Sequence, residues 1–273
     1  MSIVIRSRAA HAAILLFLCN LQQATAADPQ SGTGSRAARQ DAIAAIPFDR
    51  LDPDQRARVS DVVSDASLFR RLPTTVIQCD PDLYLFVVEH PEILANVWEL
   101  LEIDDVILTP SGPNSYRATD AGATLGNVEY LYRSHDTQLI YAEGSYDGPL
   151  FAQPVEGRCV LLLKIGYIRE PDGQYYITAR LDTFIQLDNL GQEFFAKTFQ
   201  PLVARVADTS IIQTAGFIES LSRAAELNRQ GMHRLAGRLN HVGPEVREQF
   251  VAVTAGVAAK ARLRQAARPV PRR

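Results

Sequence analysis

The sequence contains none of the short motifs that mark common catalytic and metal sites. It has no H-E-x-x-H, no G-x-S-x-G, no P-loop and no C-x-x-C. These patterns would indicate a zinc protease, a nucleophilic serine, a phosphate-binding loop or a reactive or zinc-binding cysteine pair. We therefore predict no catalytic residue, no metal ligand and no cofactor, and the sequence by itself names no activity.

A few polar residues stay open as isolated candidates. His135 and Asp136 fall in a predicted turn, where we expect a surface loop rather than a catalytic pair. The pair Asp104–Asp105 closes a helix and begins a strand, and it could bind a cation. Glu129 and Glu143 lie in predicted strands; if one of them points inward, it is the best candidate for a general acid or base.

The sequence also lacks a run of apolar residues long enough to span a bilayer, which takes about 20 residues. Near the N-terminus, Ala12–Leu18 is a short apolar core behind two arginines, and Ala24–Ala26 has the small residues of a cleavage site. We expect residues 1–26 to be a signal peptide and the mature protein to be periplasmic or secreted, without a transmembrane span. Cys19 lacks the small preceding residue of a lipoprotein signal, so we expect no lipid anchor.

Charge is unevenly spread along the chain. Residues 229–273 hold ten Lys or Arg and two acids, whereas residues 27–228 have a net charge of −13. We expect a flexible linker over 27–49, a folded domain over 50–228 and a basic helical tail over 229–273. The tail is typical of a solvated helix and could attach to an anionic surface. It has no interleaved aromatic residues, so we expect no nucleic acid as a partner.

The clearest structural signal is a hairpin over Gly157–Asp188. Within it, Glu170–Gly173 has the composition of a type I turn followed by a glycine bulge, because Pro171 fixes one φ and Gly173 accepts a positive φ. Side chains alternate along a strand, so this turn fixes both the pairing and the apolar face. The expected pairs are Glu170 with Gln174, Tyr167 with Ile177, Ile165 with Ala179, Leu163 with Leu181, and Cys159 with Ile185.

The rest of the sequence predicts helices and short strands around this hairpin. Asp52 opens one helix, which we expect to run to Pro73, and a pair of helices spans Asp80–Leu101. Strands are expected at 74–79, 106–109, 116–119, 127–133 and 138–144, and a long amphipathic helix at 210–228. The fold class is α+β: a curved antiparallel sheet of about six or seven strands wrapped on a long C-terminal helix, with an N-terminal helix and a C-terminal helical tail.

This order of elements resembles the helix-grip fold of the START and polyketide-cyclase-like (SRPBCC) superfamily. The pair of helices at Asp80–Leu101 and the closing helix over 210–228 carry the resemblance. The chain is also similar to exported bacterial proteins of no established activity that share a segment written CDPDLYLF…HPE…W, here Cys79–Phe86, His90–Glu92 and Trp98.

The resemblance implies a ligand cavity between the sheet and the last helix. Its expected lining residues are Leu161, Leu163, Ile165, Ala179, Leu181, Ile185, Ile211, Ala215 and Ile218. The resemblance also places the first strand beside the last, so that Cys79 and Cys159 are about 9.5 Å apart across two strand spacings. A disulfide needs Cα atoms within about 7 Å, which argues against one here.

Three functions follow as hypotheses. The first is an exported protein that binds an apolar or amphipathic small molecule, such as a lipid, in that cavity. The second is a structural or interaction protein whose interior is a solid core. The third is a cyclase-like or hydrolytic enzyme, which requires at least two ionisable side chains that converge in the pocket. The volume and lining of the space beneath residues 210–228 distinguish the three.

We predict that the mature protein begins at Ala27, because signal peptidase cuts after a small-x-small sequence such as Ala24–Ala26. N-terminal sequencing of the protein recovered from the periplasm or medium of a bacterial host measures this. Recovery of a chain that keeps residues 1–26 would contradict the prediction.

Overall fold

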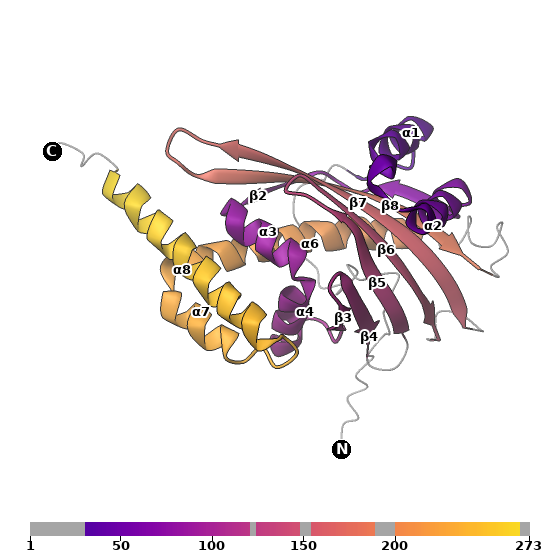
Figure 1. Ribbon diagram of the computed structural model, residues 1–273. Helices are drawn as coiled ribbons and strands as arrows, with labels where there is room; N and C mark the ends of the chain where they lie inside the picture. Colours follow the sequence, from indigo (N-terminus) through magenta and orange to yellow (C-terminus); the bar gives the residue numbers. More distant parts are fainter. Residues whose placement is uncertain (1–30, 121–123, 148–153, 189–199, 268–273) are drawn as a thin grey trace, which may run out of the picture.

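The computed structural model describes residues 31–120, 124–147, 154–188 and 200–267 (Figure 1). The expected signal peptide, residues 1–26, lies outside this range. The described chain has the predicted α+β fold, in which a curved antiparallel sheet packs on a long helix near the C-terminus. The layout is helix-grip-like.

The sheet has eight strands, slightly more than the sequence predicts. Their order in space is β1, β8, β7, β6, β5, β4 and β3, with β2 also paired to β8, and all neighbours are antiparallel. The strands are β1 (Leu68–Arg71), β2 (Thr75–Gln78), β3 (Ile107–Gly112), β4 (Ser115–Thr119), β5 (Thr124–Arg133), β6 (Thr137–Tyr146), β7 (Val155–Arg169) and β8 (Tyr175–Leu187).

Helices lie on both sides of the sheet and at one end of it (Figure 1). They are α1 (Arg36–Ala45), the short 3-10 helix η2 (Phe48–Arg50), α2 (Pro53–Ser64), α3 (Pro81–Glu89), α4 (Pro91–Leu100), α6 (Gln200–Leu227), α7 (Arg229–Ala236) and α8 (Pro244–Ala267). The predicted start of α2 is confirmed, since the Asp52 carboxylate accepts from the Gln55 N–H at 2.8 Å and Gln55 closes the capping box.

The β7–β8 hairpin has the register that its turn predicts. The Glu170 N–H donates to the Gln174 carbonyl at 2.8 Å, and Gly173 has a φ of +79°. The other expected pairs are all present, from Tyr167 with Ile177 to Cys159 with Ile185. The register therefore assigns the two faces of these strands correctly.

The edge strand beside β8 is broken into β1 and β2. Pro73 lies in the gap and has no N–H to give to the sheet. The expected helix from Asp52 to Pro73 is wrong beyond Ser64. Leu68 and Phe69 are consecutive and both buried, yet they belong to cores on opposite faces of the sheet, which is a property of a strand.

Helix α6 packs on the concave face of the sheet. Ile211 lies in one apolar cluster with Leu161 and Leu181, and Ala215 and Ile218 lie in the neighbouring cluster with residues of β2, β7 and β8. The three side chains of α6 that the sequence predicts to line the cavity, Ile211, Ala215 and Ile218, are buried there, whereas their apolar neighbour Ile212 is exposed.

The outer face of the sheet is also covered, which corrects the expected linker over 27–49. Residues 36–45 form α1, because Ala38 and Ala42 pack on this face together with residues of α2. Beneath these helices, β7 and β8 contribute Val160, Leu162 and Phe184, which are fully buried. The apolar residues on this face of the hairpin thus require a cover, and the segment before α2 supplies part of it.

The expected basic tail over 229–273 is part of the same body rather than a separate solvated helix. Met232, Leu239, Phe250 and Val257 join the core cluster of α3 and α6. Two of its cations are engaged in ion pairs, since Lys260 lies 3.0 Å from Asp80 and Arg264 pairs with Glu226. The boundary expected at 228/229 therefore does not separate two folding units.

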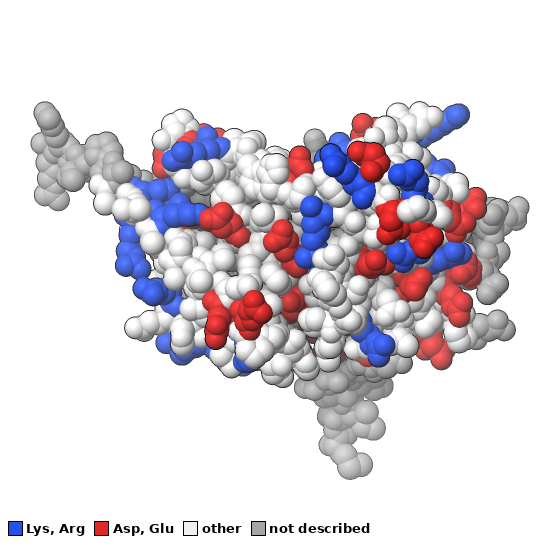
Figure 2. All heavy atoms as spheres, in the orientation of Figure 1, with Lys and Arg blue, Asp and Glu red and all other residues white. Residues whose placement is uncertain are grey.

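Basic side chains still gather at the end of the molecule that α7 and α8 form, at the left of Figure 2. Attachment of this end to an anionic surface stays a prediction. None of the helices within the described ranges is long and apolar enough to cross a membrane.

Both cysteines of the described chain, Cys79 and Cys159, are free and buried. Strand β8 lies between β2 and β7, as the resemblance implies, and keeps the two residues apart. Burial raises the pKa of each thiol to about 12, so both stay protonated and unreactive at neutral pH.

We predict that Phe250→Ala lowers the free energy of unfolding by about 3–5 kcal/mol, because it empties a fully buried site in α8. Urea denaturation measures the change. The matched control is Leu263→Ala on the same helix, where the side chain is 72% exposed and the expected change is within about 0.5 kcal/mol. If 229–273 were an independent tail, neither substitution would alter the unfolding of the sheet domain.

Candidate functional site

A cavity of about 120 Å³ lies between the concave face of the sheet and helices α3, α4 and α6. Its wall is almost entirely apolar and aromatic. The lining residues are Thr75, Ile77, Tyr84, Val87, Val88, Pro91, Leu94, Ala95, Trp98, Asp104, Val106, Leu108, Tyr116, Val128, Tyr130, Ile140, Leu161, Leu163, Ala179, Leu181, Ile211, Thr214, Ala215 and Ile218.

Seven of the nine residues predicted from the sequence line this cavity. They are Leu161, Leu163, Ala179, Leu181, Ile211, Ala215 and Ile218. The other two, Ile165 and Ile185, are buried on the same face of the sheet but pack within the cores at its two ends. The hairpin and α6 together form one wall of the cavity.

The rest of the cavity lining comes mainly from α3, α4 and strands β2 to β6, which the sequence predictions did not assign to the site. Leu94 and Trp98 could have been found, because they are four residues apart on one face of α4. Tyr116 and Tyr130 could not, because the turns that precede their strands do not fix a register. A bulge between Tyr130 and Tyr132 shifts the pairing of β5 with β6.

Two tyrosines close one end of the cavity at the junction of α3 and α4. The Tyr130 hydroxyl donates to the Val88 carbonyl at 2.8 Å, and the Tyr116 hydroxyl donates to the Glu89 carbonyl at 3.2 Å. Burial raises the pKa of Tyr116 to about 12 and raises the pKa of Tyr130 as well. Both phenols are therefore neutral donors whose protons are already used to hold the end of α3.

The other end of the cavity lies where α4 turns into β3. Helix α4 ends in a Schellman motif: the Ile103 N–H donates to the Trp98 carbonyl at 2.9 Å and the Glu102 N–H to the Glu99 carbonyl at 3.0 Å. Glu102 takes the left-handed conformation that this motif requires, with a φ of 56°, where glycine is the usual residue. The chain is thus turned sharply to bring residues 104–106 over the cavity.

Three lining residues at this α4–β3 turn, Trp98, Asp104 and Val106, are half-buried, as are Val88, Pro91 and Leu163 elsewhere in the lining. The lining residues of β5, β6 and α6 are buried. The Trp98 ring meets the Phe217 ring of α6 edge to face, with centroids 5.8 Å apart. An aromatic pair therefore bridges α4 and α6 beside the cavity.

The remaining acidic candidates do not enter the cavity. Glu129 pairs with Arg58 at 2.8 Å, and Glu143 accepts from the Tyr141 hydroxyl at 3.2 Å; both partners belong to the outer side of the sheet. His135 and Asp136 are exposed in the β5–β6 turn, which confirms the expected surface loop. Of the candidate acids, Asp104 is the one that lines the cavity.

No cluster of three or more histidine, cysteine or acidic side chains within the described ranges could hold a metal ion. Asp105, the other half of the predicted cation pair, is exposed, and the Asp104 carboxylate accepts from the Val106 N–H at 3.2 Å. That hydrogen bond closes a local turn, which explains the position of the Asp104 side chain without a bound cation.

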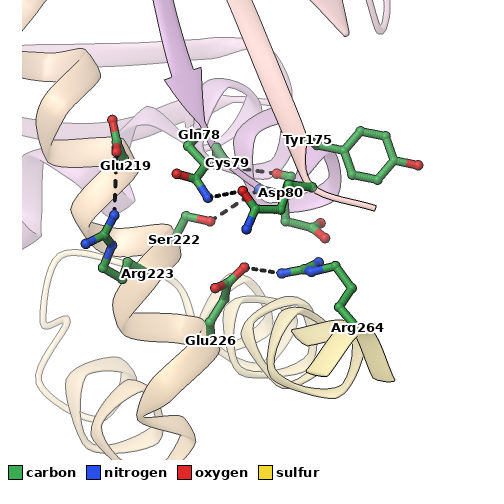
Figure 3. Close-up of a pocket in the computed structure, with 10 residues that line it drawn as sticks. Gln78, Cys79, Asp80, Tyr175, Glu219, Ser222, Arg223, Glu226 and Arg264 are labelled. Carbon is green, nitrogen blue, oxygen red and sulfur yellow. Dashed lines mark hydrogen bonds and ion pairs between the residues drawn. The ribbon is translucent and has the colours of Figure 1, made fainter. Parts of the chain in front are cut away.

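A second, polar pocket lies between the end of the hairpin, α6 and α8 (Figure 3). Its side chains are engaged with one another: Glu226 pairs with Arg264, and the Asp80 N–H donates to the Ser222 hydroxyl at 3.2 Å. The space left is about 20 Å³, room for about one water molecule. We interpret this pocket as the ion-paired joint that fixes α8 to the body.

Comparison with known proteins shows no family for this chain. No family model and no curated protein sequence matches the chain. A conserved protein from Geobacillus kaustophilus is 10% identical, with a TM-score of 0.41 over 55% of this chain and 93% of its own. The di-domain ARO/CYC protein BexL is 14% identical, with a TM-score of 0.33 over 68% of this chain and 58% of its own. Matches at these scores carry no conclusion about function.

We predict that Glu102→Gly stabilises the protein by about 1 kcal/mol, because glycine adopts the left-handed conformation without the steric cost of a Cβ atom. In thermal unfolding this corresponds to a rise of about 2–4 °C. The matched control is Glu248→Gly, an exposed position inside α8, where the same change should cost about 0.5–1 kcal/mol. Equal effects of the two substitutions would contradict the strained turn.

Proposed function

We propose that this protein binds a small apolar or amphipathic molecule in the cavity between the sheet and α6. The observation that carries the proposal is the cavity itself, about 120 Å³ of space in a wall of apolar and aromatic side chains. Protein interiors otherwise pack closely, and an empty apolar space of this size is costly to keep. A bound ligand would restore the contacts that the wall lacks.

The volume restricts the ligand. An engineered apolar cavity of about 150 Å³ in another protein binds benzene. One aromatic ring or a short alkyl chain therefore fits inside, and a longer molecule would have to extend beyond the cavity. The lining favours a ring, because Tyr84, Tyr116 and Trp98 are aromatic and rings pack favourably on one another.

The two other hypotheses receive less support. A structural protein with a solid core would leave no cavity at this place. Here the predicted residues Leu161 and Ala215 line a cavity instead. A cyclase-like or hydrolytic enzyme requires two convergent ionisable groups, whereas the described lining offers one carboxylate, Asp104, and tyrosines engaged elsewhere such as Tyr116 and Tyr130.

Membership of the START and polyketide-cyclase-like superfamily is part of the proposal. It is supported by the order of the strands, by the position of α6 on the concave face and by the place of the cavity. Export is likewise a proposal, supported by the composition of residues 1–26.

We predict that wild-type protein binds 2-phenylethanol with a dissociation constant of about 1 mM, a normal value for so few atoms in an apolar site. Ala215→Phe should weaken this binding at least about tenfold, because the added ring projects from α6 into the space that the ligand occupies. Ligand-observed NMR titration measures both.

The matched control is Ala252→Phe, which adds the same ring to an exposed position of α8 and should leave binding unchanged. The proposal fails if wild-type protein shows no saturable binding of 2-phenylethanol. It also fails if Ala215→Phe, folded by circular dichroism, binds as tightly as wild type.

A further inference from the structure

The cavity is chemically different at its two ends. Tyr116 and Tyr130 line one end, where their hydroxyls bond to the end of α3, and Trp98 and Asp104 line the other, where α4 ends. Helix α4 has ten residues, so the two ends are about 15 Å apart. A ligand with an apolar part and a polar part can therefore place them in different surroundings.

Asp104 is the one residue with a formal charge among the described residues that line the cavity. Its position is fixed, because Oδ1 accepts from the Val106 N–H at 3.2 Å. The Schellman turn before it anchors Ile103 to the carbonyl of Trp98, and both Trp98 and Asp104 line the cavity.

Several acidic residues lie near Asp104 in the sequence, but they differ in their surroundings. Glu99 is satisfied locally, with His241 at 3.3 Å and the Asn96 amide at 2.8 Å. Glu102 and Asp105 are exposed, so salt screens their charges. Asp104 is half-buried and lines the cavity, so its charge is the one best placed to attract a cation and repel an anion there.

A carboxylate and a tryptophan that line the same cavity offer a favourable site for an alkylammonium group. The carboxylate supplies charge and accepts hydrogen bonds, and the indole attracts the cation through its π electrons. Resting on the function proposed above, we propose that the physiological ligand is an amine. Its aromatic ring or short chain lies in the cavity and its ammonium group lies beside Trp98 and Asp104.

One feature at the opposite end favours a different ligand. The Arg133 guanidinium stacks on the Tyr130 ring, 3.9 Å from its centroid, and two of its buried nitrogens have no hydrogen-bond partner. Arg133 does not line the cavity, whereas the Tyr130 ring on which it stacks does. An anionic ligand directed toward Arg133 is thus the alternative outcome, and it predicts the reverse order of affinities.

Three ligands of one shape test the proposal: 2-phenylethylamine, 2-phenylethanol and 3-phenylpropanoate. They share a ring and a two-carbon arm and end in a cation, a neutral hydroxyl and an anion. We expect the amine to bind about tenfold more tightly than the alcohol, and the anion more weakly than both. Ligand-observed NMR titration at pH 7 gives the three dissociation constants.

Asp104→Asn isolates the charge, because the asparagine amide oxygen can keep the bond to the Val106 N–H. The amine should lose about tenfold in affinity while the alcohol stays within about twofold. Asp105→Asn is the matched control: it removes the neighbouring charge from an exposed side chain outside the lining, and both ligands should stay within about twofold. In wild type, raising the salt concentration should weaken the binding of the amine and leave the binding of the alcohol unchanged.

The outcomes separate this proposal from the one it rests on. If 2-phenylethanol fails to bind, the cavity is not a binding site and both proposals fail. A second outcome is that the alcohol binds but the amine binds no more tightly than the alcohol. A third is that Asp104→Asn leaves the affinity for the amine unchanged. In either case the cavity binds apolar molecules and the amine proposal is wrong. If 3-phenylpropanoate binds most tightly of the three, the amine proposal is wrong and the ligand is an anion.

Discussion

The structure depends on the burial of the β7–β8 hairpin on both faces. Leu161 and Leu181 face inward while Val160 and Leu162 face outward, and neither set can remain in water. Each face needs its own helical cover. The concave face receives α6, and the outer face receives α1 and α2 from the other end of the chain. Segments from opposite ends of the chain therefore meet on the two faces of one hairpin.

The two faces of the sheet differ in what their covers leave between helix and strand. On the outer face, Ala38 and Ala42 of α1 join one apolar cluster with Val160 and Phe184 of the hairpin. On the concave face, a space of about 120 Å³ remains between the sheet and helices α3, α4 and α6. This unfilled space is the candidate site.

Local chemistry explains which parts of this arrangement the sequence could predict. Pro171 and Gly173 fix the hairpin register without outside help, and Asp52 with Gln55 fixes the start of α2. These are contacts between near neighbours, so most of one cavity wall could be assigned by residue number. The closing helix was predictable for a related reason, since its apolar residues recur at the period of a helix.

Other parts depend on distant partners and leave little local signal. Strand β1 has only four residues, and its identity comes from pairing with β8 more than a hundred positions later. Helix α1 fully buries only Ala38 and Ala42, with Ile43 half-buried beside them, so its apolar signal in the sequence is weak. The tail is held by Phe250 and Lys260 against α3 and α6, which a count of charges cannot reveal. The tyrosine end of the cavity depends on a bulge in β5.

The cavity has a mechanical consequence. Unfolding eliminates internal void volume, so a protein that keeps such a space unfolds with a larger decrease in volume than a fully packed one. Hydrostatic pressure therefore acts against this fold through the space beneath α6. A molecule that fills the space removes that volume difference, and the liganded protein becomes the less compressible state.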